Sequence, residues 1–186
     1  MIGNHNYINP DIESSYKKNN IGKTIYDVVI KYKPKTVVEF GTLYGYSAVA
    51  IAQALQKNNN KSELICYDLW EDYKYKHSNV NIAKQNIEKY GLSDIVTFKK
   101  INYYDWLKAP THFDLLHIDI SNDGNVILDA FYHLSKNDNI IMFEGGSIER
   151  DNIKWMKLYD KLHMNVIKSI VKYRIINNNF PSISIM

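Results

Sequence analysis

Three acidic side chains follow short apolar runs at the points where those runs end. Asp68 closes ELICYD, Asp119 closes FDLLHID and Glu144 closes IIMFE. If the runs are neighbouring parallel strands, their carboxyl ends meet at one edge of a sheet, where ligands bind in open α/β folds. Carboxylates at such an edge can accept a substrate proton, bind ribose hydroxyls or hold a hard cation such as Mg²⁺.

A glycine-containing turn stands in VVEFGTLYGYSAVAIAQAL, between an apolar run and a helical pattern. Gly41 lets the backbone turn sharply and Gly45 lets it approach a ligand or the next helix, whose first N–H groups are unpaired. The spacing is not the G-x-G-x-x-G of dinucleotide-binding folds, and Glu39 would repel a pyrophosphate. The glycines alone leave open a tight turn without a ligand. With Asp68 after the next strand, they favour a nucleoside whose tail carries an ammonium or sulfonium group.

Helices and strands must position these residues, and the hydrophobic periodicity predicts where they lie. Helices are predicted over residues 21–33, 46–57, 79–90, 123–135 and 152–162. Strands are predicted over residues 36–40, 63–67, 95–100, 113–119 and 139–143, with a closing hairpin of residues 172–176 and 182–186. The alternation predicts an α/β fold with a mostly parallel sheet, helices on both faces and an antiparallel C-terminal hairpin. We expect an N-terminal arm, residues 1–20, before a single domain, residues 21–186.

Composition narrows the functional class. The net charge is +3 and the lysines are scattered rather than clustered, so we expect no nucleic-acid partner. No apolar run reaches the roughly 20 residues of a membrane span, and the N-terminus lacks the apolar core of a signal peptide. Cys66 is the single cysteine, so a disulfide within the chain is impossible. These features predict a cytoplasmic protein.

Two motifs carry a resemblance to a known family. EFGTLYG, residues 39–45, resembles motif I of the class I S-adenosylmethionine-dependent methyltransferases, and VEFGTLYGYS resembles its form in small O-methyltransferases. FDLLHID resembles motif IV, and the segment from there through IIMFEGG is similar to small bacterial enzymes that include sugar and macrolide O-methyltransferases and the cephalosporin-hydroxylase group. The resemblance covers residues 20–186 and implies a Rossmann-like sandwich whose seven-stranded sheet has the order 3-2-1-4-5-7-6.

The resemblance implies S-adenosylmethionine as cofactor and assigns its methionine part to the first turn. Glu39 would bind the ammonium group by a charge-assisted hydrogen bond, and the backbone from Gly41 through Thr42 to Gly45 would cradle the tail. Ser47 would cap the following helix, with contact to the cofactor carboxylate as the alternative.

The nucleoside part is assigned to the ends of the next strands. Asp68 would bind both ribose hydroxyls, and Asn102 stands where the family reads the adenine amino group. Leu69 and Trp70 would flank the adenine, although Trp70 is equally well read as a core residue. Asp119 would lie beside the cofactor at the end of the motif IV strand.

For the chemistry we predict Asp119, Glu144 and His117 as catalytic residues. Cation-dependent relatives bind their metal with an Asp after strand 4 and an Asp-Asn or Asp-Asp pair after strand 5. Asp119 matches the first ligand, whereas Glu144 and Gly145 replace the pair, so an Mg²⁺ site of Asp119 and Glu144 is one hypothesis. A direct general base, Asp119 or Glu144, is the other. His117 is read either as a catalyst or as a packed core residue.

The predicted function is methyl transfer to an oxygen of a small molecule, such as a sugar or a related metabolite. A protein or nucleic-acid methyltransferase of the same fold is an alternative. A nucleoside-binding protein without catalysis is another, and a dinucleotide-dependent oxidoreductase is disfavoured by the glycine spacing. The partner expected is a small-molecule acceptor, and a homodimer stays open.

Overall fold

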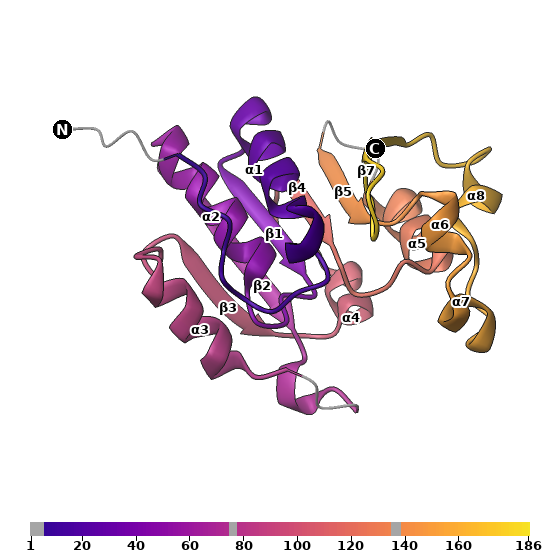
Figure 1. Ribbon diagram of the computed structural model, residues 1–186, viewed down its shortest axis with the longest axis horizontal. Coiled ribbons are helices and arrows are strands. Elements are labelled where there is room, and N and C mark those ends of the chain that lie inside the picture. The colour runs from indigo at the N-terminus through magenta and orange to yellow at the C-terminus, as the bar shows by residue number, and fades with distance from the viewer. Residues whose placement is uncertain (1–5, 75–77, 135–138) are drawn as a thin grey trace.

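A seven-stranded mixed sheet forms the centre of the molecule (Figure 1). The computed structural model describes residues 6–74, 78–134 and 139–186, so residues 1–5 of the predicted arm and residue 135 of a predicted helix lie outside the described residues. The strands are β1 (Thr36–Phe40), β2 (Glu63–Asp68), β3 (Val96–Lys100), β4 (Leu115–Ile118), β5 (Ile140–Glu144), β6 (Arg174–Asn177) and β7 (Ile183–Ile185). Their order is β3-β2-β1-β4-β5-β7-β6, with β1 to β5 parallel and β7 antiparallel to both its neighbours. The predicted fold and strand order are confirmed.

Eight α-helices are present in the described part of the chain: α1 (Ile21–Tyr32), α2 (Tyr46–Asn58), α3 (Val80–Lys89), α4 (Tyr103–Lys108), α5 (Gly124–Leu134), α6 (Ile148–Asp151), α7 (Lys154–Leu158) and α8 (Met164–Ile167). The single helix predicted over residues 152–162 is wrong. Ile153 has an extended backbone and Asp160 a positive φ of 48°, so only α7 forms between them. The helices α4, α6 and α8 were not predicted, because each is too short to show a helical period.

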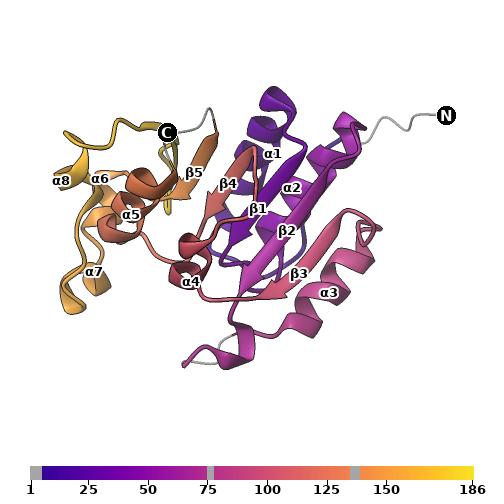
Figure 2. The same ribbon diagram turned by 180° about the vertical axis from the view of Figure 1, so that it is seen from behind.

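Two apolar clusters lie on opposite faces of the sheet, because alternate strand residues point to opposite sides. Val37 of β1 belongs to the cluster beneath α1, α2 and α3, whereas its neighbour Val38 belongs to the cluster beneath α4, α5 and α8. Figures 1 and 2 show these two helical layers from the front and from behind. The carboxyl ends of β1 to β4 are left between the layers, at the lower edge in both views.

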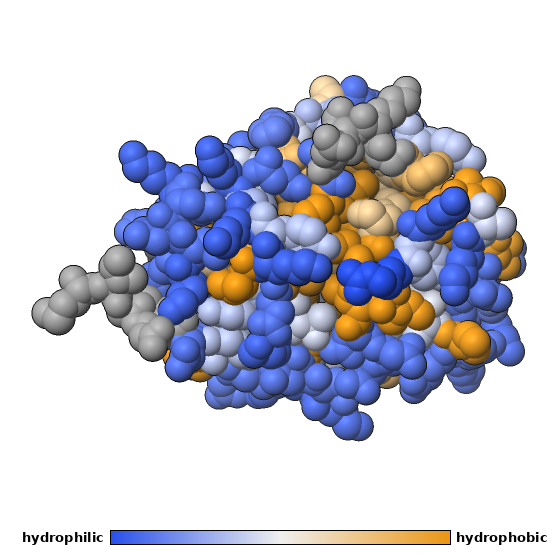
Figure 3. Space-filling model, turned by 90° about the horizontal axis from the view of Figure 1, so that it is seen from above, coloured by the Kyte–Doolittle hydropathy of each residue, from blue (hydrophilic) through white to orange (hydrophobic). Residues whose placement is uncertain are grey.

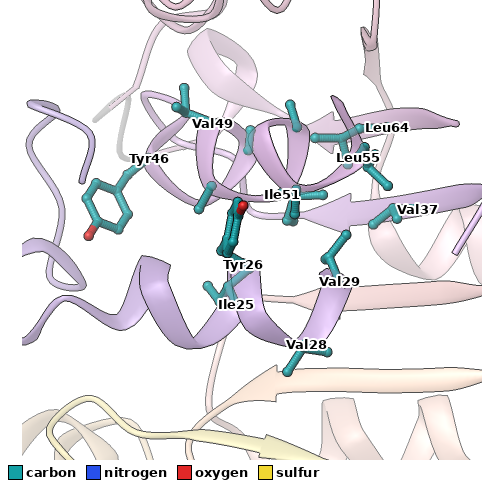
Figure 4. Packing of buried hydrophobic residues seen from close by; sticks show 14 of the residues in the cluster. Ile25, Tyr26, Val28, Val29, Val37, Tyr46, Val49, Ile51, Leu55 and Leu64 are labelled. Atoms are coloured by element: carbon teal, nitrogen blue, oxygen red, sulfur yellow. The ribbon is translucent and has the colours of Figure 1, made fainter. Parts of the chain in front are cut away.

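The helices α1 and α2 pack closely against each other beside β1. Figure 4 shows Ile25 and Val29 of α1 directed toward Ile51 and Leu55 of α2. The small side chains Ala48, Ala50, Ala52 and Ala54 are fully buried and allow this approach. The same packing sets the direction in which α2 leaves the turn after β1.

The described part of the predicted arm is packed against the domain. Ile12 and Tyr16 are buried in the same cluster as α1 and α2. The backbone N–H of Ile8 donates to the Gln53 side chain at 2.8 Å, and that side chain donates back to the Ile8 carbonyl at 3.0 Å. The arm therefore crosses α2 and reaches the carboxyl ends of the strands (Figure 1).

The end of the sheet opposite to these carboxyl ends faces the viewer in Figure 3, where hydrophobic residues form a band between hydrophilic ones.

None of the helices in the described ranges is long and apolar enough to cross a membrane.

Candidate active site

A cavity of about 400 Å³ opens at the carboxyl ends of β1, β2 and β4. Its walls come from the turn after β1, from Asp68 and Leu69 after β2, from Asn102 before α4 and from the segment after β4. The arm adds a further wall with Glu13, Ser14 and Ser15. Its volume lies within the range typical of small-ligand pockets. Segments that are far apart in the sequence therefore meet at the edge predicted for the ligand.

Gly41 makes the first turn possible. Its φ is +89°, and a Cβ at this position would overlap the backbone carbonyl of Asp119. The turn is held by a hydrogen bond from the Gly41 N–H to the Tyr67 carbonyl, at 3.1 Å. Gly45, with a φ of 92°, then begins α2. The turn after β1 and the end of β4 therefore approach each other more closely than any residue with a side chain would allow.

Asp68 holds the rim of the cavity in shape. One carboxylate oxygen accepts from the Leu43 N–H at 2.9 Å, and the other accepts from the Leu69 N–H at 2.7 Å. The side chain also lines the cavity. Because each carboxylate oxygen can accept more than one hydrogen bond, Asp68 can brace the turn and still accept from ribose hydroxyls. That contact remains a prediction.

Of the residues predicted around adenine, two line the cavity and one is buried in the core. Leu69 lines the cavity, whereas Trp70 is 1% exposed, packs against Phe98 with ring centroids 6.0 Å apart, and is not among the described lining residues. The core interpretation of Trp70 is therefore confirmed, and this buried position does not support its predicted place beside adenine. Asn102 lines the cavity, and its side-chain oxygen caps α4 by accepting from the Tyr104 N–H at 2.9 Å. Sequence reasoning missed this capping role.

Ser47 and Thr42 present hydroxyl groups at the start of α2. Gly45 is the N-cap of α2 and no side chain caps that helix, so the capping role predicted for Ser47 is wrong. Ser47 is buried and lines the cavity instead. Thr42 also lines the cavity, and within the described chain its buried hydroxyl makes no hydrogen bond of ordinary geometry. A buried polar atom without a partner at this turn fits a polar ligand group.

Glu39 faces the interior rather than the cavity. The strand register places Glu39 beside His117 of β4 and Cys66 of β2, so the three side chains form a row across the sheet. The Glu39 carboxylate lies 3.0 Å from Nδ1 of His117 and 3.7 Å from the Cys66 sulfur, and all three residues are fully buried. Glu39 is not among the described residues that line the cavity, so its predicted contact with an ammonium group stays a prediction that this position does not support. The catalytic role predicted for His117 is likewise unsupported, and its core interpretation is confirmed.

Asp119 reaches the cavity from the end of β4. It lines the cavity, and the parallel pairing of β4 and β5 brings the side chain of Glu144 alongside it. Burial, and then the charge of Glu144, hold the pKa of Asp119 well above its ordinary value of 3.8. The Tyr16 hydroxyl acts weakly in the opposite direction on the pKa of Asp119, although it makes no hydrogen bond of ordinary geometry. Sequence reasoning missed Tyr16.

Glu144 is paired with Arg150. The Arg150 Nε donates to a Glu144 oxygen at 2.8 Å, and Nη2 of the same guanidinium donates to the same oxygen. Both residues are buried. The guanidinium carbon lies 5.8 Å from the Trp155 ring and 5.6 Å from the Phe180 ring, which encloses the pair in aromatic surface.

The predicted Mg²⁺ site does not fit these contacts. Glu144 is already bound by Arg150, and Asp123 is bound by Lys161 at 3.1 Å and by the backbone N–H groups of Asn125 and Leu162. Among the residues that the structure describes, no group of three or more His, Cys, Asp or Glu side chains is arranged to hold a metal ion. The metal role predicted for Asp119 and Glu144 therefore finds no support in this arrangement.

The sheet order, the glycine turn packed on the end of β4 and the cavity beside them define a class I methyltransferase fold. The profile of a family described as a methyltransferase domain matches residues 38–142, which is more than half of the chain. The chain therefore belongs to this family. No curated protein matches its sequence.

Solved structures share the whole fold. Cofactor-bound Rv0187 from MTB is 18% identical, with 95% of this chain and 81% of that chain covered and a TM-score of 0.64. The Bacillus cereus O-methyltransferase in complex with SAH is 18% identical, with 95% and 83% covered and a TM-score of 0.63. The Streptomyces achromogenes O-methyltransferase TomG, involved in tomaymycin synthesis and solved with SAM, is 14% identical, with 95% and 81% covered and a TM-score of 0.62. At these identities the similarity shows the fold.

Proposed function

We propose that this chain is an S-adenosylmethionine-dependent methyltransferase that methylates an oxygen of a small molecule, such as a sugar or a related metabolite. The observation that carries the proposal is the cavity between Gly41, Asp68 and Asp119, at the strand ends where the fold family binds its nucleoside. Two structures of the same fold, from Bacillus cereus and Streptomyces achromogenes, contain SAH and SAM.

The residues present suit this cofactor. The backbone of the turn after β1, with the hydroxyls of Thr42 and Ser47, would hold the methionine tail, and Asp68 would hold the ribose. Leu69 offers an apolar wall for the adenine, and Asn102 also lines the cavity. When bound, S-adenosylmethionine supplies a methyl group on a positively charged sulfur, which is the reactive carbon of the transfer.

The chain's own task is to orient the acceptor and take its proton. Asp119 reaches the cavity, and its raised pKa makes its ionised form a stronger base than an exposed aspartate. We infer that Asp119 accepts the proton of the acceptor hydroxyl as the oxygen bonds to the methyl carbon. Glu144, fixed by Arg150, lies beside Asp119, and its charge helps to raise the pKa of Asp119. Glu13, Ser15 and Tyr104 line other parts of the cavity, where we place the acceptor.

A nucleoside-binding protein without catalysis is the second candidate, because Arg150 already binds Glu144, one of the two predicted catalytic carboxylates. The partner we propose is a small-molecule acceptor rather than a nucleic acid, in a cytoplasmic setting, and a homodimer stays open. The decisive test is methyl transfer from radiolabelled S-adenosylmethionine to a panel of sugars, phenols and hydroxylated metabolites. We expect one acceptor class to be labelled by the wild type and at least roughly a hundredfold more slowly by Asp119→Asn. Tight cofactor binding without labelling of any acceptor would favour the second candidate.

A further inference from the structure

Three carboxylates, those of Asp119, Asp123 and Glu144, could form a cation site. Two of them are already paired with basic side chains of the chain. Arg150 binds Glu144, and Lys161 binds Asp123 at 3.1 Å. Asp119 is left facing the cavity. A divalent cation prefers several free carboxylate or carbonyl oxygens, so each of these internal ion pairs removes a donor that such a cation would need.

Arg150 is held in this position from several sides. Its backbone N–H donates to the Ser147 hydroxyl at 3.2 Å, and its carbonyl accepts from the Asn122 side chain at 3.4 Å. The guanidinium lies near the rings of Trp155 and Phe180 and donates twice to Glu144. A guanidinium is always charged and suits buried pairing with a carboxylate, so this cation is a permanent part of the site.

We propose that Arg150 takes the place of a divalent cation, fixing Glu144 behind Asp119 so that the site needs no bound metal. Arg150 is thereby a positioning residue, which acts on the cavity through Glu144 and Asp119. The claim that this placement serves methyl transfer rests on the proposed function. The claim that Arg150 replaces a metal ion does not depend on it.

The proposal is tested by titrating Mn²⁺ into the full-length protein, without cofactor or acceptor, and following free Mn²⁺ by electron paramagnetic resonance. We expect no one-to-one binding by the wild type. Arg150→Met keeps a long apolar side chain but removes the charge, so it should raise the affinity for Mn²⁺ by roughly tenfold or more. The double variant with Asp119→Asn should lose this Mn²⁺ site again. Arg150→Lys keeps the charge and should gain nothing. Arg174→Met, which removes an exposed arginine of β6, is the matched control.

Each result decides the matter. One-to-one Mn²⁺ binding by the wild type, abolished by Asp119→Asn, would overturn the proposal. So would an Arg150→Met variant that gains no more affinity than Arg174→Met. If Arg150→Met does not fold, Arg150→Gln replaces it, because Gln still donates a hydrogen bond to Glu144 but carries no charge. If neither variant folds, the wild-type titration still shows whether the site binds Mn²⁺. Mn²⁺ binding is measured without cofactor or acceptor, so its result is independent of cofactor binding and of activity.

Discussion

Nδ1 of His117 lies 3.0 Å from Oε1 of Glu39, and neither side chain has exposed surface. The sequence suggested a cofactor contact for Glu39 and, for His117, either catalysis or a packed position in the core. Their strands, β1 and β4, pair in a register that places the two residues side by side, so they satisfy each other inside the sheet. This pair supports the end of β1, from which the glycine turn leaves.

The Glu39–His117 pair should therefore matter for stability and little for ligand affinity. Glu39→Ala leaves the His117 ring and the Cys66 thiol without their partner, and we expect a loss of about 3–5 kcal/mol in the free energy of unfolding. Glu39→Gln keeps an acceptor and should cost about 1–2 kcal/mol. Urea denaturation measures both. If folded Glu39→Gln binds S-adenosylmethionine at least roughly tenfold more weakly than the wild type, Glu39 contacts the cofactor after all.

The raised pKa of Asp119 makes this residue a source of pH-dependent instability. Its pKa lies above the ordinary 3.8 in the folded state, so folding favours the protonated form. Stability from this group is fully present below the unfolded pKa and is lost as the pH rises toward the folded pKa. Asp119→Asn should therefore melt at a higher temperature than the wild type at pH 7, and the difference should shrink as the pH falls toward about 4. A variant that melts lower than the wild type at pH 7 would contradict this expectation.

Tyr16 should act mainly through its ring. The ring is 1% exposed and lies 6.2 Å from the His117 ring, while the hydroxyl makes no ordinary hydrogen bond within the described chain. Tyr16→Phe should change the free energy of unfolding by less than about 1 kcal/mol, and Tyr16→Ala should lower it by about 3–5 kcal/mol through the cavity that it leaves. Chemical denaturation compares the two. Equal losses in both variants would mean that the hydroxyl is strongly bonded to Asp119.

Gly41 and Gly91 offer a matched comparison. Both have positive φ, +89° and +67°, but an added Cβ overlaps the Asp119 carbonyl at Gly41 and meets nothing within 4 Å at Gly91. Gly91→Ala should cost about 1–2 kcal/mol of stability from backbone strain alone. Gly41→Ala should cost more and should also weaken cofactor binding, because the turn and β4 must separate. Similar losses and unchanged binding in both variants would show that the close approach is unimportant.

Much of the fold could be predicted because each strand is a short β-branched or apolar run that ends in a turn. The helix predicted over residues 79–90 is α3, which ends at Lys89 and is followed by Gly91 with a φ of +67°. The C-terminal region could not be predicted in the same way. The helices α6, α7 and α8 each span only about one helical turn, so no hydrophobic period shows where each of them begins and ends.

Several residues that line the cavity were predicted, but the pairs that the buried polar side chains form with one another were not. Asp68, Leu69 and Asp119 line the cavity because a residue that follows a parallel strand must lie at the sheet edge. The pairing of Glu39 with His117 was not predicted, because strand register decides what a buried polar side chain faces and cannot be read from one strand alone. The Arg150–Glu144 pair joins β5 to the helix after it through a loop whose conformation no local pattern specifies.

The central claim is that the cavity binds S-adenosylmethionine, and calorimetric titration tests it most directly. S-adenosylmethionine and S-adenosylhomocysteine are titrated into the wild type, into Asp68→Asn and into Asp94→Asn, an exposed aspartate that serves as control. We predict micromolar one-to-one binding of both ligands to the wild type and to Asp94→Asn. Binding to Asp68→Asn should be weaker by at least roughly tenfold, since a ribose acceptor is lost. Absence of binding of either ligand by the folded wild type would contradict the account.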